Sequence, residues 1–405
     1  MWNKWQLFHA TDFQSLMLPC FTFFRILGIF PYKINVSIFE PSRPRYVLLT
    51  VVMCCNIIYQ IIRIYYVLSR NSYNSKICQK IRDSCYFLSE TFILIVWIVM
   101  TKPYMRLLQT ISEVSSKLSR KSYKKLSKLI HFKDIFGFYL MIGHGFLTLS
   151  RYCFPSENST SCVLIFVIEY YTRFQTFQIS MLYIDCVCIL KACFERIDDK
   201  LTSLRELIIN DDSHPLGMIY RQQRNLLVLN EIKVLQKEYT TVSDVVQMLN
   251  MIFSPQILAI FTEVFTEVTF NLYASIVRWN NGIYINLTEQ IHNFVLTSYL
   301  LYHITRVMFI VWACETSKNQ AIKISTTIYD VSNSTNNDQI RNELRLFSLQ
   351  VLHRDNTFSA KGFTIDATFL RKMIGTITTY FLILIQFLIA THTCDKKVNI
   401  TELSN

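Results

Sequence analysis

The chain has 405 residues, of which 51% are hydrophobic and only 17% charged, and its mean hydropathy is +0.26. Soluble domains carry about 25% charged residues, so this composition excludes an ordinary soluble protein and favours a polytopic helical membrane protein. The net charge of +12 does not indicate nucleic acid binding, because apolar segments interrupt the basic residues. We expect membrane lipids as partners, through phospholipid headgroups on one leaflet, and no nucleic acid.

The first apolar stretch, residues 16–30, is too short for a full membrane crossing and contains Pro19 and Arg25. It also lacks the small-residue cleavage site of a secretory signal. We interpret it as an interfacial or re-entrant helix within a cytoplasmic N-terminal region, residues 1–44.

Seven later segments are long and apolar enough for membrane crossing, which takes about 20 mostly apolar residues per helix. They are residues 45–68, 85–101, 134–152, 162–190, 249–277, 292–314 and 373–391. The predicted fold class is therefore all-α, a polytopic membrane protein with seven transmembrane helices.

The connecting loops set the predicted orientation. Of the 41 Lys and Arg residues, 30 fall before the first span or in the second, fourth and sixth loops, and eight fall in the other loops and the tail. Cytoplasmic loops carry such an excess. The N-terminus is therefore predicted to be cytoplasmic, and residues 392–405 are predicted to form an extracellular tail.

Candidate modification sites agree with this orientation. Of five glycosylation sequons, those at Asn158, Asn286 and Asn399 lie in segments predicted to be extracellular, whereas those at Asn35 and Asn333 lie on the cytoplasmic side and would be unused. Cys153 and Cys162 flank a short polar loop on the predicted extracellular side. A disulfide between them and an unbonded pair are both compatible with this spacing.

The cytoplasmic loops also carry helical patterns. In residues 337–354, apolar side chains recur at spacings of four, three and four, at Ile340, Leu344, Phe347 and Val351. Residues 220–238 resemble an inward extension of the fifth span, with an apolar stripe at Val228, Ile232 and Leu235. Apolar stripes in water need a partner, so we expect these helices to pack together and residues 315–372 to form a cytoplasmic anchor segment.

No pattern in the chain indicates an enzyme, a cofactor or a metal site. The sequence has no nucleophile elbow, no zinc-binding His-Glu-x-x-His and no phosphate-binding glycine loop, and its twelve cysteines lack metal-ligand spacing. Polar residues in the outer halves of the spans are instead candidates for a ligand pocket. They are His144, Glu169, Tyr170, Arg173, Glu263, Thr266, Glu267, Thr297 and Tyr299.

Charged residues at membrane depth usually face a cavity or each other. Glu169 and Arg173 are four residues apart on one helix, and we expect them to pair. Glu263 and Glu267 have like charge at the same spacing. Either they line an outward-facing cavity suited to a polyhydroxylated or cationic small molecule, or they bond to Arg173 or Arg306.

The last span contains an unusual element: Thr379 and Tyr380, five apolar residues, then Gln386 and Phe387. An amide at that depth costs free energy unless it is paired or faces water, so Gln386 either bonds between helices or lines a water-filled wall.

Together with residues 343–350 and 358–366, this element resembles the signature of the insect gustatory receptor family. Residues 25–31 and 250–256 look like further elements of that family. The strong match covers roughly the last hundred residues. Thr364 departs from the pattern, since many members have Phe there, but it precedes the span and leaves the pore assignment intact.

The resemblance implies a ligand-gated, non-selective cation channel in the plasma membrane of chemosensory neurons. It implies a homo- or heterotetramer with other gustatory receptors, a pore lined by the seventh helix, and a small-molecule tastant bound in the outer half of residues 45–314. Gln386 and Phe387 would lie at the constriction. Thr379 would line the inner pore or bond back to its own helix.

Two other classes remain as alternatives. A G-protein-coupled chemoreceptor would have its N-terminus outside, and the sequence lacks Asp-Arg-Tyr after the third span and Asn-Pro-x-x-Tyr in the seventh. A membrane transporter would show internal repeats or matching broken spans, and none is evident.

Overall fold

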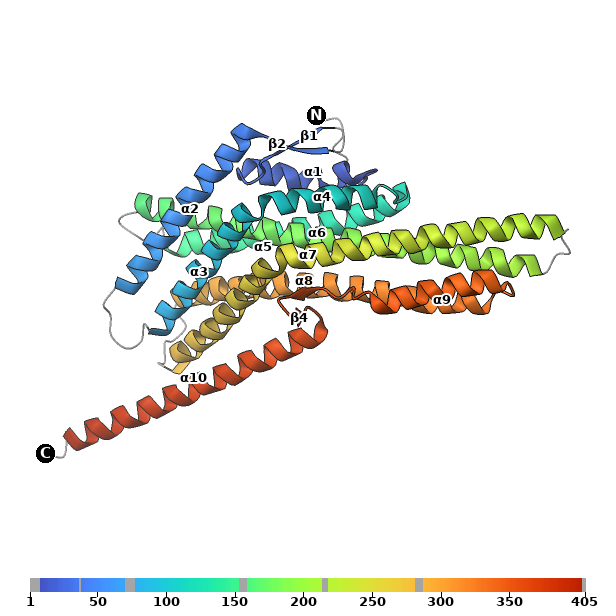
Figure 1. The fold of residues 1–405 in the computed structure, drawn as a ribbon. Coiled ribbons are helices and arrows are strands. Elements are labelled where there is room, and N and C mark those ends of the chain that lie inside the picture. Colours follow the sequence, from blue (N-terminus) through green and yellow to red (C-terminus); the bar gives the residue numbers. More distant parts are fainter. Residues whose placement is uncertain are drawn as a thin grey trace.

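The computed structural model describes residues 8–35, 38–69, 77–152, 159–212, 218–280 and 287–402, and it is almost entirely helical (Figure 1). Its helices are α1 (Phe13–Ile26), α2 (Arg43–Ser69), α3 (Ile77–Val99), α4 (Thr101–Ser115), α5 (Arg120–Tyr152), α6 (Ser159–Asp212), α7 (Met218–Asn280), α8 (Leu287–Asn333), α9 (Asp338–His353) and α10 (Ala367–Glu402). Two short antiparallel hairpins, which the sequence did not predict, are β1 (Tyr32–Asn35) with β2 (Ile38–Pro41) and β3 (Ser359–Ala360) with β4 (Phe363–Thr364). The all-α fold class is confirmed.

Each predicted span coincides with a helix. Among the described residues, α2, α6, α7, α8 and α10 are long and apolar enough to cross a membrane on their own. α3 and the start of α4, which bends away from it by 70°, meet the same criteria only when they are taken together as one broken span. Pro103 lies in the first turn of α4 and has no N–H to continue the α3 ladder, which accounts for the break. The crossing by α5 remains a prediction.

Three helices extend far beyond a bilayer. α6, α7 and α8 have 54, 63 and 47 residues. At 1.5 Å per residue α7 is about 95 Å long, against a hydrocarbon thickness of about 30 Å. Figure 1 shows these helices running side by side into a long arm, where α9 packs on α7 and α8.

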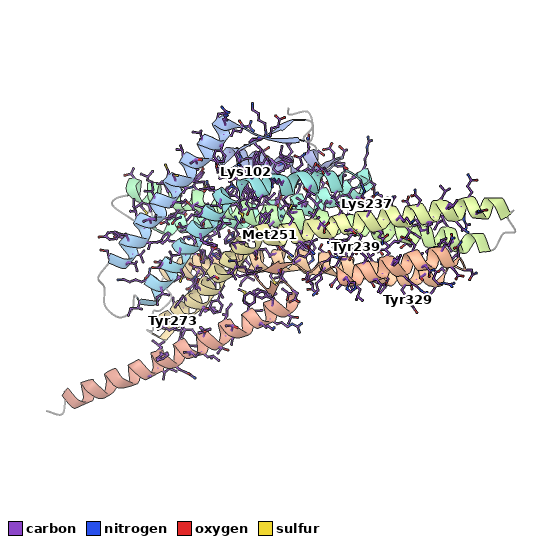
Figure 2. The ribbon with its side chains drawn as sticks, in the orientation of Figure 1. Lys102, Lys237, Tyr239, Met251, Tyr273 and Tyr329 are labelled. Carbon is purple, nitrogen blue, oxygen red and sulfur yellow. The ribbon has the colours of Figure 1, made fainter. Side chains whose placement is uncertain are left out.

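The arm buries both predicted apolar stripes. Ile340, Leu344, Phe347 and Val351 are all buried on α9, as are Val228, Ile232 and Leu235 on α7. Tyr239 of α7, labelled in Figure 2, lies with its ring 5.7 Å from that of Phe347 and accepts a hydrogen bond from Asn356 Nδ2 at 2.7 Å. The predicted packing between these helices is therefore confirmed.

Polar contacts align α6 with α8 in the arm. The buried carboxylate of Asp198 on α6 pairs with Lys323 Nζ at 2.8 Å and accepts a hydrogen bond from Thr327 Oγ1 at 2.5 Å. Because Lys323 and Thr327 are one turn apart on α8, these contacts fix the axial register of the two helices.

The apolar N-terminal stretch forms α1, which is buried against α4, α5 and α6. Its 14 residues span about 21 Å, too short to cross a bilayer. The helix ends at Ile26, and Gly28 turns the chain away with a φ of +68° that glycine adopts readily, while Ile29 N donates to Phe24 O at 2.9 Å.

The β3–β4 hairpin connects the arm to α10 and is fastened to α7. Ser359 N donates to Asn250 Oδ1 at 3.2 Å, and Lys361 N donates to Ser254 Oγ at 2.5 Å. The turn needs left-handed backbone at Lys361 and at Gly362, where φ is +91°. Residues 250–256 and 358–366, two of the motifs noted in the sequence, therefore contact each other.

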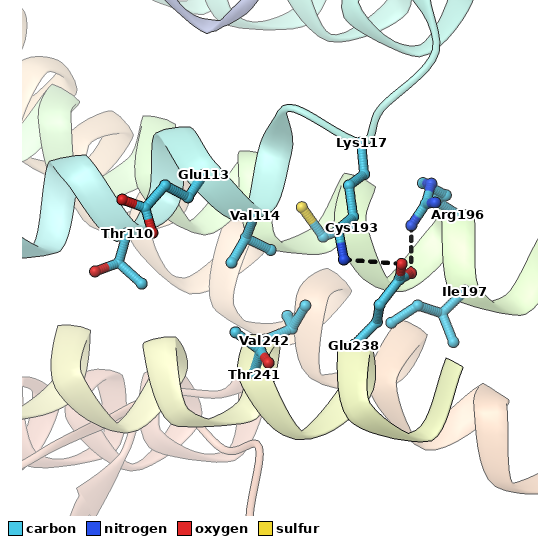
Figure 3. Close-up of a pocket in the computed structure, with 10 residues that line it drawn as sticks. All are labelled: Thr110, Glu113, Val114, Lys117, Cys193, Arg196, Ile197, Glu238, Thr241 and Val242. Atoms are coloured by element: carbon cyan, nitrogen blue, oxygen red, sulfur yellow. Dashed lines mark hydrogen bonds and ion pairs between the residues drawn. The ribbon is translucent and has the colours of Figure 1, made fainter. Parts of the chain in front are cut away.

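A small cavity of about 170 Å³ lies where the end of α4 meets α6 and α7 (Figure 3). Glu238 of α7 joins the three, since it pairs with Lys117 at 3.0 Å and with Arg196 of α6. It lies eleven residues before the predicted fifth crossing. Burial by itself would raise the pKa of Glu238, but the hydrogen bonds from Lys117 and Arg196 outweigh burial and lower that pKa below its ordinary value.

We expect Glu238→Gln to destabilise the purified protein at pH 7.5 by about 1–2 kcal/mol, because two charge-assisted hydrogen bonds are lost. A carboxylate with a lowered pKa stabilises the fold above its unfolded pKa of about 4.3, and this contribution is lost as the pH falls through the folded pKa. The difference in Tm between wild type and variant, followed by tryptophan fluorescence, should therefore shrink below about pH 4.3.

The matched control is Glu231→Gln on the same helix, whose carboxylate is 40% exposed and pairs with Lys200 at 2.8 Å. This exposed pair should contribute well under 1 kcal/mol. Equal Tm losses in the two variants, or a Glu238→Gln difference independent of pH, would contradict the role given to Glu238.

Candidate functional site

The candidate ligand site is an open cavity of about 400 Å³ lined by residues of α2, α3, α5, α6, α7 and α8. It lies in the half of the bundle opposite the arm, which is the predicted outer half. Five of the nine predicted pocket residues line it: His144, Glu169, Arg173, Glu267 and Tyr299. Four helices contribute these five side chains, so residues scattered over 156 positions of sequence meet at one site.

Arg173 of α6 provides a fixed cation in the wall. Its Nε donates to Tyr86 Oη at 2.9 Å, and its guanidinium lies over the rings of Tyr86 and Tyr299, 4.8 and 5.2 Å from their centroids. His144 Nε2 lies 3.4 Å from Arg173 Nη1. Aromatic faces attract a cation and hold its position, so Arg173 is oriented before any ligand arrives.

The expected pair between Glu169 and Arg173 is wrong. Glu169 pairs instead with Arg63 of α2 at 2.7 Å and accepts a hydrogen bond from Tyr59 Oη at 3.4 Å. The cation–π contacts occupy Arg173, and α2 brings a second guanidinium to Glu169. Spacing along one helix does not show what neighbouring helices supply.

The opposite wall holds an alternating chain of charges and amides. Asn271 Nδ2 donates to Glu267 Oε2 at 3.0 Å, and Asn271 Oδ1 accepts from Arg82 Nη1 at 3.0 Å. Arg82 also pairs with Asp83 at 2.8 Å. The cavity thus offers fixed donors and fixed acceptors, which suits a small molecule bearing several hydroxyls.

Below the cavity lies a fully buried ionic layer. Arg306 of α8 contacts Glu263 Oε2 at 3.3 Å and donates from Nε and Nη2 to Ser180 Oγ at 2.9 and 2.7 Å. Of the two alternatives for the acidic pair, Glu263 therefore bonds to Arg306, whereas Glu267 lines the cavity.

Three predicted pocket residues lie elsewhere. Tyr170 Oη donates to Met141 O, and Thr266 Oγ1 donates to Glu263 O on its own helix at 2.9 Å. Thr297 is exposed on α8. The sequence analysis did not identify Arg63, which falls inside the first predicted span, or Arg82, which falls just before the predicted start of the second span.

The candidate pore residues lie on α10. Thr379, Gln386 and Phe387 are all exposed, Phe387 by 67%. Thr379 Oγ1 donates to Gly375 O at 3.0 Å on its own helix, as one alternative predicted. Between Ala367 and Ala390 of α10 only Ile377 is buried, and Figure 1 shows the C-terminal end of α10 diverging from the other helices.

Comparison with known families agrees with this architecture. The family model described as 7tm chemosensory receptor matches residues 17–391. The chain belongs to this family.

Similar proteins are insect chemosensory receptors. The receptor is 22% identical over 228 residues to a putative gustatory receptor 2a and 25% identical over 276 residues to a putative gustatory receptor 28a, both of Drosophila melanogaster. These alignments cover 51% and 64% of the receptor and 53% and 60% of the relatives, so the receptor matches little more than half of their length.

The fold resembles that of the olfactory receptor OR5 from Machilis hrabei. The TM-score is 0.70 at 13% identity, with 92% of the receptor and 98% of OR5 covered. A second structure of OR5, in complex with eugenol, gives a TM-score of 0.63 at 14% identity with the same coverage. At this identity the likeness shows the fold alone.

The remaining predicted sites are partly outside the described residues, as Cys153, Asn158 and Asn286 are. Cys162 is disulfide-bonded, and pairing with Cys153 remains a prediction. Asn399 falls within the last turns of α10, since this helix continues eleven residues beyond the predicted end of the span. Within the described ranges, no group of three or more His, Cys, Asp or Glu side chains has the arrangement of a metal site.

Two glycines of α5 provide a matched test of the packing behind the cavity. A Cβ at Gly145 would lie 2.5 Å from Tyr170 Cζ, whereas a Cβ at Gly143 would meet nothing within 4 Å. Tyr170 also stacks on Phe166, a residue of the cavity wall, with ring centroids 5.0 Å apart. We expect Gly145→Ala to lower the Tm of the purified receptor by an amount equivalent to about 1–3 kcal/mol.

Gly143→Ala should leave the Tm unchanged or raise it slightly, because alanine favours the helix. Adding Tyr170→Leu to Gly145→Ala should recover part of the loss. Equal Tm values for the two single variants would show that Tyr170 does not need the space at Gly145.

Proposed function

We propose that the receptor is a tastant-gated, non-selective cation channel whose pore is lined by α10 of four subunits. The observation that carries the proposal is an apolar helix of membrane length, exposed everywhere between residues 378 and 390 except for partly buried positions, that contains an exposed glutamine. An amide facing hydrocarbon costs free energy, so the exposed Gln386 is better accounted for by a water-filled pore than by lipid.

The placement of residues on α10 supports a narrow gate. Thr379 and Gln386 are seven residues apart, so they lie within about 20° of each other around the helix. Phe387 lies about 100° farther round. In a four-fold arrangement, a ring of phenyl side chains closes an apolar throat by dewetting, and rotation of α10 replaces it with a ring of amides.

A direct path connects the cavity to the pore helix. Glu267 lines the cavity from α7, and Phe265, two residues earlier on the same helix, contacts Tyr380 of α10 edge-on at 5.7 Å. A ligand that shifts α7 therefore acts on α10 within one helical turn. The complex of OR5 with eugenol supports a small organic molecule as the stimulus.

The proposed setting is the plasma membrane of chemosensory neurons. The proposed assembly is a homo- or heterotetramer with other gustatory receptors. The arm formed by α6, α7, α8 and α9 would supply the cytoplasmic contacts between subunits, because it extends well beyond the membrane-spanning helices of its own chain (Figure 1).

Pore substitutions test the assignment of α10. In cells that express the receptor, Phe387→Ala should raise the current without ligand severalfold, because a smaller side chain wets the throat. Gln386→Glu should raise divalent over monovalent permeability through added negative charge. Ile385→Ala, at similar depth but about 160° from Phe387 and about 100° from Gln386 on the other side, is the control and should leave both properties unchanged.

Ligand-evoked currents that are identical in wild type, Phe387→Ala and Gln386→Glu, at equal surface expression, would contradict a pore made by α10.

Substitution of the two glutamates separates cavity from core. We expect Glu267→Gln to raise the ligand concentration for half-maximal current at least tenfold at normal surface expression, because it removes a negative charge from the cavity wall. Glu263→Gln should instead reduce surface expression, since it leaves the buried Arg306 without its counter-charge.

Thr262→Ala, an exposed position on α7, is the control for both glutamates. An unchanged dose–response in Glu267→Gln would argue that the ligand does not enter this cavity.

A further inference from the structure

One face of α5 changes its chemistry sharply along the helix. The first turns expose five cations, Arg120, Lys121, Lys124, Lys125 and Lys128. The following turns expose large apolar side chains, Leu129, Phe132, Ile135, Phe136, Tyr139, Ile142 and Phe146.

Both groups lie on the same side of the helix. At 3.6 residues per turn, the five cations fall within an arc of about 140°, and all the apolar residues except Leu129 at its edge fall within nearly the same arc. Tyr123, Leu126, Ile130 and Met141 are buried on the opposite side. A single outward face therefore runs from basic to apolar, as at the boundary between lipid headgroups and hydrocarbon.

The row of cations extends farther from the apolar face than the headgroup layer is thick. Lys128 is one residue from the apolar face, but Arg120 is nine residues away, or about 13 Å along the helix. The headgroup region on each side of a bilayer is only about 5–8 Å thick. Phospholipids with a single phosphate can reach only the cations nearest the apolar face, such as Lys128. A headgroup whose phosphates project farther into the cytoplasm can contact all five cations.

The protein itself neutralises little of this charge. Lys125 pairs with Glu195 of α6 at 3.3 Å, with the lysine side chain 79% exposed. The other four cations have no ion pair with a described residue. Exposed cations next to an apolar face attract anionic lipids by roughly fivefold in affinity for each charge.

We propose that this face of α5 binds polyphosphorylated inositol lipids of the cytoplasmic leaflet. The inference rests on the cytoplasmic placement of the basic segments and not on channel activity. His144 of the same helix lines the candidate ligand cavity, so the lipid would hold the inner end of a helix that forms part of that cavity.

The test is native mass spectrometry of the full-length receptor in detergent micelles with phosphatidylinositol 4,5-bisphosphate, phosphatidylserine or phosphatidylcholine. We expect retained phosphatidylinositol 4,5-bisphosphate and little of the others. The triple variant Lys121→Gln, Lys124→Gln and Lys128→Gln should bind it about 100-fold more weakly, at roughly fivefold per removed charge.

The matched control removes three exposed cations of the arm, with Lys233→Gln, Lys237→Gln and Arg345→Gln, and should bind like wild type. If the glutamine variant folds poorly, replacement of the same three lysines by arginine keeps the charge and should keep binding. Hydrogen exchange in residues 120–129 should also slow when the lipid is added to wild type.

Three results would overturn the proposal: equal binding by the α5 and arm variants, equal retention of phosphatidylserine at matched charge, or full competition by free inositol trisphosphate. The first would indicate a diffuse charge effect, the second a headgroup of single charge, and the third a soluble ligand. Failure of ligand-evoked currents would leave this binding result standing, so the lipid site and the channel are tested separately.

Discussion

A buried guanidinium holds the membrane bundle together. Arg306 lies on α8 and is 2% exposed, and its partners come from the other two of the three longest helices: Glu263 of α7, and Ser180 and the Thr176 carbonyl of α6. A charge at this depth is tolerated only when it is neutralised and its donors are satisfied, so α6, α7 and α8 can associate in few registers. The cavity above this layer and the arm below it both inherit that alignment.

Buried or half-buried charges also align the helices of the arm. Asp198 fixes α6 to α8, Glu238 joins α7 to α6 and to the segment after α4, and apolar stripes fill the space between the helices. The cavity differs from the arm because its charged side chains are held by neighbouring residues and still face the open space of the cavity. Rigid partners such as Tyr86 and Tyr299 around Arg173 leave polar groups oriented for a ligand rather than for one another.

Periodicity within one helix was a dependable guide to this fold. The spacing of Ile340, Leu344 and Phe347 predicted the buried face of α9, and apolar length predicted where the crossing helices lie. Pairing between helices was not predictable in the same way. The partner of Glu169 is on α2, more than a hundred residues away, and the bend at Pro103 moves the start of α4 in a direction that hydropathy does not encode.

The sequence therefore predicted that a polar cavity exists, but it identified only some of the residues that line it. Polar residues at membrane depth marked its outer position, and five of them do line it. Thr266 and Thr297 lie at similar depth but point away, because depth along a helix does not specify which side faces the cavity. Short β hairpins such as β3–β4 were also missed, since two-residue strands carry too little periodicity to detect.

Pro255 gives α7 a point of weakness in its middle. Proline has no N–H to donate, so the carbonyl of Met251, labelled in Figure 2, lacks its bond within the helix. Ser254 and Asn250, which hold the β3–β4 hairpin, lie within that turn. The bend of α7 at Pro255 therefore coincides with the attachment of the β3–β4 hairpin that leads into α10, so the direction of α7 at this point sets where α10 begins relative to the cavity and the arm.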